Sequence, residues 1–92
     1  MKRCCRSVVT GRVQGVYYRG TAVRQAQSLG IVGYARNRAD GSVEVVACGE
    51  RAAVDDFVAW LWEGSVAAKV TGVVTEELSL DVGQKLTGFS AG

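Results

Sequence analysis

The sequence contains no histidine and no proline among its 92 residues. The lack of histidine excludes the Ser-His and Cys-His pairs that activate many nucleophilic hydrolases. Without proline, and with no serine-rich, repetitive or low-complexity stretch, nothing in the sequence marks a linker or an internal boundary. A chain of this length has room for one small hydrophobic core. We therefore expect residues 1–92 to form a single domain.

Long hydrophobic runs are also missing. No apolar stretch approaches the roughly 20 residues that a membrane span requires. The start, MKRCCRSVV, lacks a long apolar segment with a cleavage site. These absences predict a cytoplasmic protein with no membrane partner.

Cysteine is scarce, and the three present cannot all pair within one chain. Cys4 and Cys5 are neighbours in a predicted strand, where successive side chains point to opposite faces, so they cannot share a metal ion like a Cys-x-x-Cys motif. No Cys, Asp and Glu cluster shows metal-site spacing, and we expect neither a metal nor a cofactor. We expect the cysteines to be buried or half-buried thiols in a reducing compartment.

Acidic residues are absent from the first 39 positions, which carry eight basic ones. All nine carboxylates lie from Asp40 onward. The natural partner of such a cationic segment is an anion, and both a small phosphorylated molecule and a nucleic acid fit this charge. For Lys2, Arg3 and Arg6 we expect plain solvated surface charge.

Apolar spacing and glycine positions predict the order of the elements. We expect a strand over 4–11, a helix from about Arg19 to Gly30, strands over 31–37 and 42–49 joined by a turn at Asp40-Gly41, a helix with the apolar stripe Val54, Phe57, Val58, Leu61 and Trp62 that ends at Gly64, a strand over 69–80, and a short, weak strand within LTGFSAG. This βαββαβ order predicts an α+β, ferredoxin-like fold, with an antiparallel sheet and two helices on one face.

The stretch GRVQGVYYRG, residues 11–20, lies where the first strand gives way to the first helix. Backbone N–H groups at such a junction have no helical partners and can converge on an anion. Gly11 and Gly15 allow the backbone to curl, while Val13 and Val16 can anchor the loop in the core. Arg19 adds a guanidinium that matches phosphate geometry. The segment therefore predicts a phosphate-binding loop, although neither a Walker motif nor a dinucleotide fingerprint is present.

Two segments, GRVQGVYYR and LGIVGYARNRADGSVEV, together resemble the acylphosphatase family. The matching positions are Gly11, Val13, Gln14, Gly15, Val16, Tyr18, Arg19, Leu29, Gly30, Gly33, Tyr34, Asn37, Asp40, Gly41, Val43, Glu44 and Val45. Tyr18 and Tyr34 stand where the family commonly has phenylalanine and tryptophan, and both retain an aromatic ring. The resemblance implies a ferredoxin-like fold and hydrolysis of acyl phosphates to a carboxylate and inorganic phosphate.

Acyl phosphates have a good leaving group, so positioning and charge stabilisation are the main tasks of such an enzyme. We expect Arg19 and the backbone amides of Gln14, Gly15, Val16, Tyr17, Tyr18 and Arg19 to bind the phosphoryl group. The resemblance implies that Asn37 holds the attacking water and that catalysis is noncovalent and metal-free. We expect Tyr17, Tyr18 and Tyr34 to be packing or rim aromatics.

Two alternatives remain open at this point. A nucleic-acid module of the same topology would present aromatic residues on its central strands, but SVEVVACG contains none. A noncatalytic domain of this family is the other alternative. We expect a monomer that acts on a small-molecule acyl phosphate and binds no nucleic acid.

Overall fold

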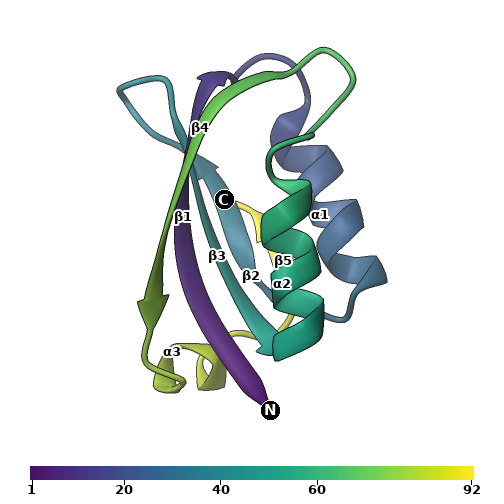
Figure 1. Cartoon of the computed structure of the whole chain (residues 1–92), viewed down its shortest axis with the longest axis vertical. Coiled ribbons are helices and arrows are strands. Elements are labelled where there is room, and N and C mark those ends of the chain that lie inside the picture. Colours follow the sequence, from purple (N-terminus) through teal and green to yellow (C-terminus); the bar gives the residue numbers. More distant parts are fainter.

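The computed structural model describes all residues from 1 to 92 and contains five strands and three helices (Figure 1). In chain order these are β1 (Lys2–Arg12), α1 (Tyr18–Ser28), β2 (Val32–Asn37), β3 (Val43–Glu50), α2 (Arg51–Trp60), β4 (Lys69–Leu78), α3 (Asp81–Gln84) and β5 (Phe89–Ala91). The predicted βαββαβ order is confirmed, and α3 and β5 follow it. None of the helices has the length and apolar character that crossing a membrane would need.

The strands form one sheet in the order β4-β1-β3-β2-β5. β1 pairs antiparallel with β3 and β4, and β2 pairs antiparallel with β3. The expectation of an antiparallel sheet is wrong at one edge, because β5 runs parallel to β2. The reason is that β4 ends at the end of the sheet where β2 begins. After α3, the chain therefore runs along β2 in the same direction and forms the edge strand β5.

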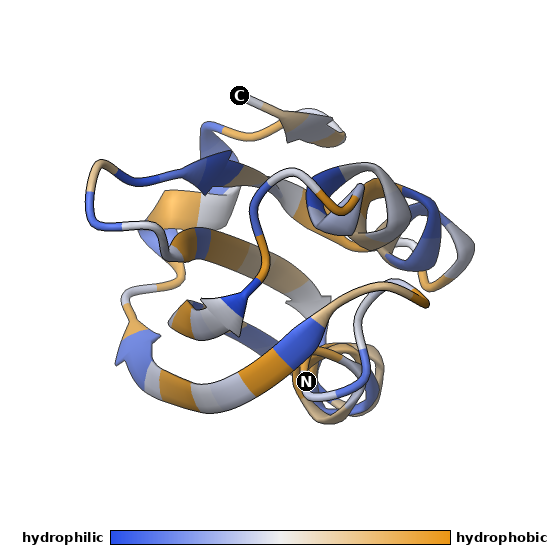
Figure 2. Cartoon of the chain, turned by 90° about the horizontal axis from the view of Figure 1, so that it is seen from above, coloured by the Kyte–Doolittle hydropathy of each residue, from blue (hydrophilic) through white to orange (hydrophobic).

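Helices α1 and α2 lie together on one face of the sheet, as predicted (Figures 1 and 2). The buried side of α1 includes Ala22 and Ala26, whose small side chains allow the helix to approach the sheet closely. The buried side of α2 includes Val54 and Phe57. Both helices thus present a stripe at helical spacing to the sheet.

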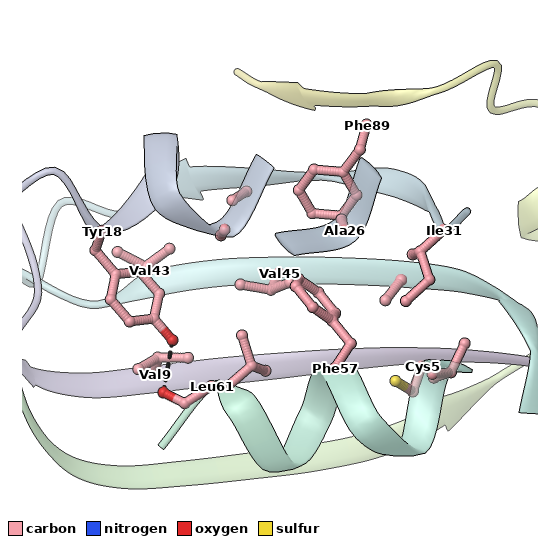
Figure 3. Packing of buried hydrophobic residues seen from close by; sticks show 14 of the residues in the cluster. Cys5, Val9, Tyr18, Ala26, Ile31, Val43, Val45, Phe57, Leu61 and Phe89 are labelled. Atoms are coloured by element: carbon pink, nitrogen blue, oxygen red, sulfur yellow. Dashed lines mark hydrogen bonds between the residues drawn. The ribbon is translucent and has the colours of Figure 1, made fainter. Parts of the chain in front are cut away.

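The hydrophobic core fills the space between this sheet face and the two helices (Figure 3). Phe57 lies at its centre, with its ring centroid 5.5 Å from that of Phe89 and 5.8 Å from that of Trp60. Phe89 anchors β5, which explains why a segment of only three residues forms an edge strand. The C-terminal strand that the sequence only weakly indicates is therefore present.

The end of α2 differs from the sequence prediction. Helix α2 ends at Trp60, so Leu61 remains buried while Trp62 is 53% exposed and leaves the predicted apolar stripe. In β4 a register shift opposite Thr10 and Gly11 changes the alternation, so Val70 and Val73 both pack against the core. The shift is a β-bulge, in which one extra residue of β4 offsets it against β1.

The cysteines also differ from the prediction. Cys4 and Cys48 form a disulfide with a Cα–Cα distance of 4.2 Å, whereas Cys5 is a buried free thiol. The two bonded residues stand directly opposite each other in the antiparallel β1–β3 pair. Cys5 belongs to the core, so Cys4 and Cys48 lie on the other sheet face. The expectation of three thiols is therefore wrong for two of them.

Candidate active site

Two valines anchor the loop between β1 and α1 in the hydrophobic core, as predicted. Val13 is fully buried and Val16 packs against the core. Between and after them, Gly15 has φ +75° and Tyr17 has φ +62°. Where residues in the left-handed backbone conformation alternate with residues in the right-handed one, successive N–H groups point toward one side. They then form a concave site for an anion. The loop therefore has the backbone form of an anion cradle.

The amides of this loop have no acceptors within the protein. None of the N–H groups from Gln14 to Tyr17 donates a hydrogen bond to a backbone or side-chain atom. Helix α1 begins immediately afterward, and its N-cap residue Tyr17 provides no side-chain cap. The amides of the first helical turn also lack intrahelical acceptors. A run of N–H donors and the positive end of a helix dipole thus meet at one place.

An open cavity of about 590 Å³ lies against this loop. Arg19 and Asn37, which are far apart in the sequence, both line it. Of the other predicted site residues, Gly15, Tyr17 and Tyr18 also line the cavity, whereas Gln14 and Val16 do not. The remaining lining residues are Val13, Gly20, Val23, Arg24 and Ala91. The structure thus brings together the guanidinium, the carboxamide and most of the loop.

Gln14 has a side-chain contact that sequence reasoning did not find. Its carboxamide nitrogen donates to the carbonyl oxygens of Arg38 at 2.8 Å and Ser42 at 2.9 Å. The two acceptors lie at the two ends of the β2–β3 turn, since Arg38 directly follows Asn37 and Ser42 directly precedes β3. Gln14 therefore links the loop to the hairpin that carries Asn37. The only signal in the sequence is a polar residue between two anchoring valines.

A second contact supports the loop from the α2–β4 connection. The Ser65 hydroxyl donates to the carbonyl oxygen of Val16 at 2.7 Å. The buried Tyr18 hydroxyl donates to the carbonyl oxygen of Leu61 at 2.8 Å, and burial raises the pKa of this phenol. Tyr18 is thus a neutral packing residue, as predicted, and it joins the start of α1 to the end of α2 (Figure 3).

Charges are distributed unevenly around the cavity. Ion pairs join Lys2, Arg3, Arg6 and Arg36 to carboxylates of Glu44, Glu50, Asp55, Glu76 and Glu77. The expectation of plain solvated charge is wrong for Arg3 and Arg6, because paired strands and helix α2 place carboxylates beside them, whereas Lys2 remains an exposed surface charge beside Glu50.

The arginines nearest the loop behave differently. Arg12, Arg19, Arg24 and Arg38 have no carboxylate partner. No acidic residue lines the cavity. Nor does the structure gather three or more His, Cys, Asp or Glu side chains into a group that could hold a metal ion. The cavity thus offers positive charge and N–H donors, which suit a phosphoryl group.

The family model of the acylphosphatases matches residues 5–91, which is nearly the whole chain. The chain belongs to the acylphosphatase family. Acylphosphatases hydrolyse acyl phosphates, and the predicted family and enzyme class are confirmed.

Curated acylphosphatases from several bacteria are similar in sequence. The acylphosphatase of Chromohalobacter salexigens is 53% identical over 75 residues, which cover 82% of this chain and 83% of that protein. The acylphosphatase of Xanthomonas euvesicatoria is 56% identical over 71 residues, covering 77% of this chain and 81% of that protein.

Solved acylphosphatase structures share the fold. The acylphosphatase of Bacillus subtilis has a TM-score of 0.91 at 35% identity and covers 100% of this chain and 99% of its own. The acylphosphatase of Coxiella burnetii gives the same TM-score and identity, covering 99% of this chain and 93% of its own. A segment of full-length HypF, 12% of that chain, has a TM-score of 0.84 at 16% identity and shares the fold alone. The predicted fold class is confirmed by these structures.

Proposed function

We propose that this acylphosphatase uses the loop from Gln14 to Arg19 as its phosphoryl site and Asn37 as the residue that orients water. The observation that carries this proposal is the cavity that Arg19, Asn37 and the loop line together. Unpartnered amides beside an unpaired guanidinium form an oxyanion-type site for the phosphoryl oxygens. Asn37 can both accept a hydrogen bond from water and donate one, which an attacking water requires.

The reaction is an in-line displacement at phosphorus. The oxygen of water bonds to phosphorus as the bond from phosphorus to the acyl oxygen breaks. The carboxylate leaves with the electron pair, and the proton of water passes to the released phosphate. Arg19 and the amides stabilise charge on the phosphoryl oxygens, and no strong base is needed because the leaving group is a weak base. The proposed reaction uses no metal ion or cofactor.

Phosphate release from benzoyl phosphate tests this function, measured with and without a chelator. We expect release that the chelator does not change and that Arg19→Ala or Asn37→Ala lowers by about 100-fold or more, since each removes a transition-state contact. Arg51→Ala is the matched control, because it removes an exposed, unpaired arginine from the start of α2. Full activity in the Arg19 and Asn37 variants would refute the assigned roles.

The noncatalytic alternative gives a different result in the same assay. A binding domain would take up inorganic phosphate through the loop but release none from benzoyl phosphate. Isothermal titration with phosphate separates the two cases when it is paired with the release assay. Phosphate binding without turnover in the unaltered protein would favour the binding domain.

The remaining proposals concern the molecule as a whole. We propose that residues 1–92 act as one acylphosphatase unit, as a monomer and without nucleic acid, in the cytoplasm. The redox state of Cys4 and Cys48 in cells tests the location: cytosolic reductants should keep this pair reduced in cells, and a pair found oxidised there would contradict the proposed location. Light scattering measures the molar mass in solution, and a mass above the 9.7 kDa of one chain would contradict the proposed monomer.

A further inference from the structure

The cavity does not end at the phosphate loop but continues along α1. Gly20, Val23 and Arg24 line this extension, and Tyr17 lines it from the loop. Arg24 lies five residues beyond Arg19, which is a rise of about 7.5 Å along a helix. Both arginines line the same cavity, so a phosphoryl group seated at the loop leaves the part of the cavity beside Val23 and Arg24 for the acyl group.

Tyr17 and Arg24 form a joined wall of this extension. The guanidinium carbon of Arg24 lies 5.8 Å from the centroid of the Tyr17 ring, within the range of a cation–π contact. The ring lies over Gly20, because its carbons occupy the space that a side chain at Gly20 would need. The left-handed backbone of Tyr17 is fixed by Thr21, whose hydroxyl donates to the Tyr17 carbonyl oxygen at 2.9 Å. The structure thus gives the Arg24 head group a defined place at the cavity wall.

Arg24 has charge that no group of the protein neutralises. It forms no ion pair, and the cavity wall contains no acidic residue. Arg3 and Arg6, by contrast, each bind two carboxylates. Between Arg19 and Arg24, Val23 offers an apolar surface against which carbon atoms can pack.

We propose that Arg24 determines substrate specificity by binding a second anionic group, a carboxylate, at the far end of the acyl moiety. The preferred substrates are then acyl phosphates whose acyl group is itself negatively charged. This inference rests on the proposed function, since it assumes that the loop holds the phosphoryl end. Tyr17 acts as a positioning residue that holds the Arg24 guanidinium at the wall.

Two matched substrates test the proposal, namely benzoyl phosphate and 4-carboxybenzoyl phosphate. They share the reacting group and differ by one carboxylate, which the rigid ring holds on the side away from phosphorus. The readout is the ratio of kcat/KM for the carboxylated substrate to that for benzoyl phosphate. For the unaltered protein at low salt we expect a ratio of about five, the upper range for an exposed ion pair.

Three variants separate Arg24 from general charge effects. Arg24→Gln should lower the ratio to about one, and Arg24→Lys should retain part of the preference. Arg51→Gln changes the net charge equally at an exposed, unpaired arginine on α2 and should keep the ratio of the unaltered protein. Circular dichroism confirms that each variant is folded.

Each outcome decides between the two proposals. If the unaltered protein hydrolyses benzoyl phosphate without preferring the carboxylated substrate, the Arg24 proposal is wrong and the proposed function stands. An equal fall of the ratio in the Arg24→Gln and Arg51→Gln variants would also overturn it, because the preference would then be a long-range charge effect. If the folded protein hydrolyses neither substrate, the proposed function is wrong, and the Arg24 proposal, which rests on it, is wrong as well.

Discussion

Gln14 shows how a single side chain can couple two parts of a site. Its carboxamide joins the loop to the carbonyl groups of Arg38 and Ser42. Asn37 lies one residue before Arg38, so the distance between the loop and the Asn37 carboxamide depends on this link. A misplacement of about 1 Å can lower a rate by about 100-fold. Gln14 is therefore a positioning residue for the proposed water site.

We expect Gln14→Met, which keeps the size of the side chain but removes the donor, to lower kcat by about 10- to 100-fold. KM should change much less, because the loop amides that bind phosphate remain. Steady-state kinetics with benzoyl phosphate measures both constants. Gln27→Met, at an exposed position of α1, is the control. A loss of stability with kcat unchanged would show that Gln14 is only structural.

Glu44 is the other residue whose environment has a measurable consequence. It is buried on the sheet face away from α1 and α2, where it accepts hydrogen bonds from Arg6 and Arg36. Burial alone would raise the pKa of the Glu44 carboxyl, but the two guanidinium groups outweigh burial and lower this pKa. A lowered pKa in the folded state stabilises the fold above the unfolded pKa, about 4.3, and this contribution disappears as the pH falls through the folded value.

We expect Glu44→Gln to lower the free energy of unfolding by about 1–3 kcal/mol at pH 7, because a charged acceptor is lost between two arginines. The deficit relative to the unaltered protein should shrink as the pH falls below the unfolded pKa of about 4.3, and it should disappear once the pH lies below the lowered pKa of Glu44 in the folded protein. Urea denaturation at a series of pH values measures this difference. A deficit of the same size at pH 7 and pH 3 would show that the ionisation of Glu44 does not contribute to the free energy of unfolding.

At the scale of elements, the disulfide and α3 stabilise the end of the sheet opposite the loop. The Cys4–Cys48 bond joins β1 to β3 across 44 residues of sequence. Gly83 of α3 packs on this bond, where an added Cβ would lie 3.2 Å from the sulfur of Cys4 and 3.1 Å from the Cβ of Cys48. A glycine thus allows α3 to lie directly on the disulfide.

We expect reduction of this disulfide to lower the free energy of unfolding by about 2–4 kcal/mol, since a cross-link over a long loop restricts the unfolded chain. Denaturation midpoints with and without reductant measure the effect. The Cys4→Ala/Cys48→Ala double variant should be insensitive to reductant. Phosphate release by the native fold should not depend on the bond, because the active site lies at the other end of β1. Equal midpoints in both redox states would refute a stabilising role.

For the whole molecule, the main feature is the separation of paired from unpaired charge. Most carboxylates in ion pairs lie on the sheet and at the start of α2, while Arg12, Arg19, Arg24 and Arg38 surround the loop without partners. A net charge of only +2 therefore conceals a positive field at one end. Such a field attracts anionic substrates and is screened by salt.

We expect kcat/KM for benzoyl phosphate to fall several-fold between about 10 mM and 150 mM salt, because the Debye length shortens from about 30 Å to about 8 Å. Arg12→Gln, near the loop but outside the cavity wall, should flatten this dependence. Arg51→Gln should leave it as it is in the unaltered protein. A salt dependence that is identical in all three proteins would contradict attraction by the loop arginines.

The sequence predicts those features that depend on local signals. The loop, both long helices and the β2–β3 turn follow from glycine positions and apolar spacing, and the family follows from two motifs. Features that depend on which residues of two strands stand opposite each other cannot be predicted from such local signals. Cys48 lies opposite Cys4 only after β1 has paired with β3, and the ion pairs of Arg3 and Arg6 likewise join distant segments.

Short elements and long-range contacts were missed for similar reasons. Helix α3 is a single turn of four residues and has no periodic pattern to detect. The Gln14 contact joins residues 24 and 28 positions apart, and its acceptors are backbone atoms with no sequence signature. The roles of Arg19 and Asn37 stay predictions, although both residues line one cavity.

The position of the last residues has a practical consequence for handling the enzyme. Ala91 lines the cavity, and the Gly92 amide donates to the Ala35 carbonyl oxygen at 3.0 Å. Met1 lies at the end of β1 away from the loop (Figure 1). A purification tag fused after Gly92 would thus emerge beside the cavity mouth and compete with substrate for space. Tethering the enzyme to a resin or electrode through its amino terminus leaves that mouth open.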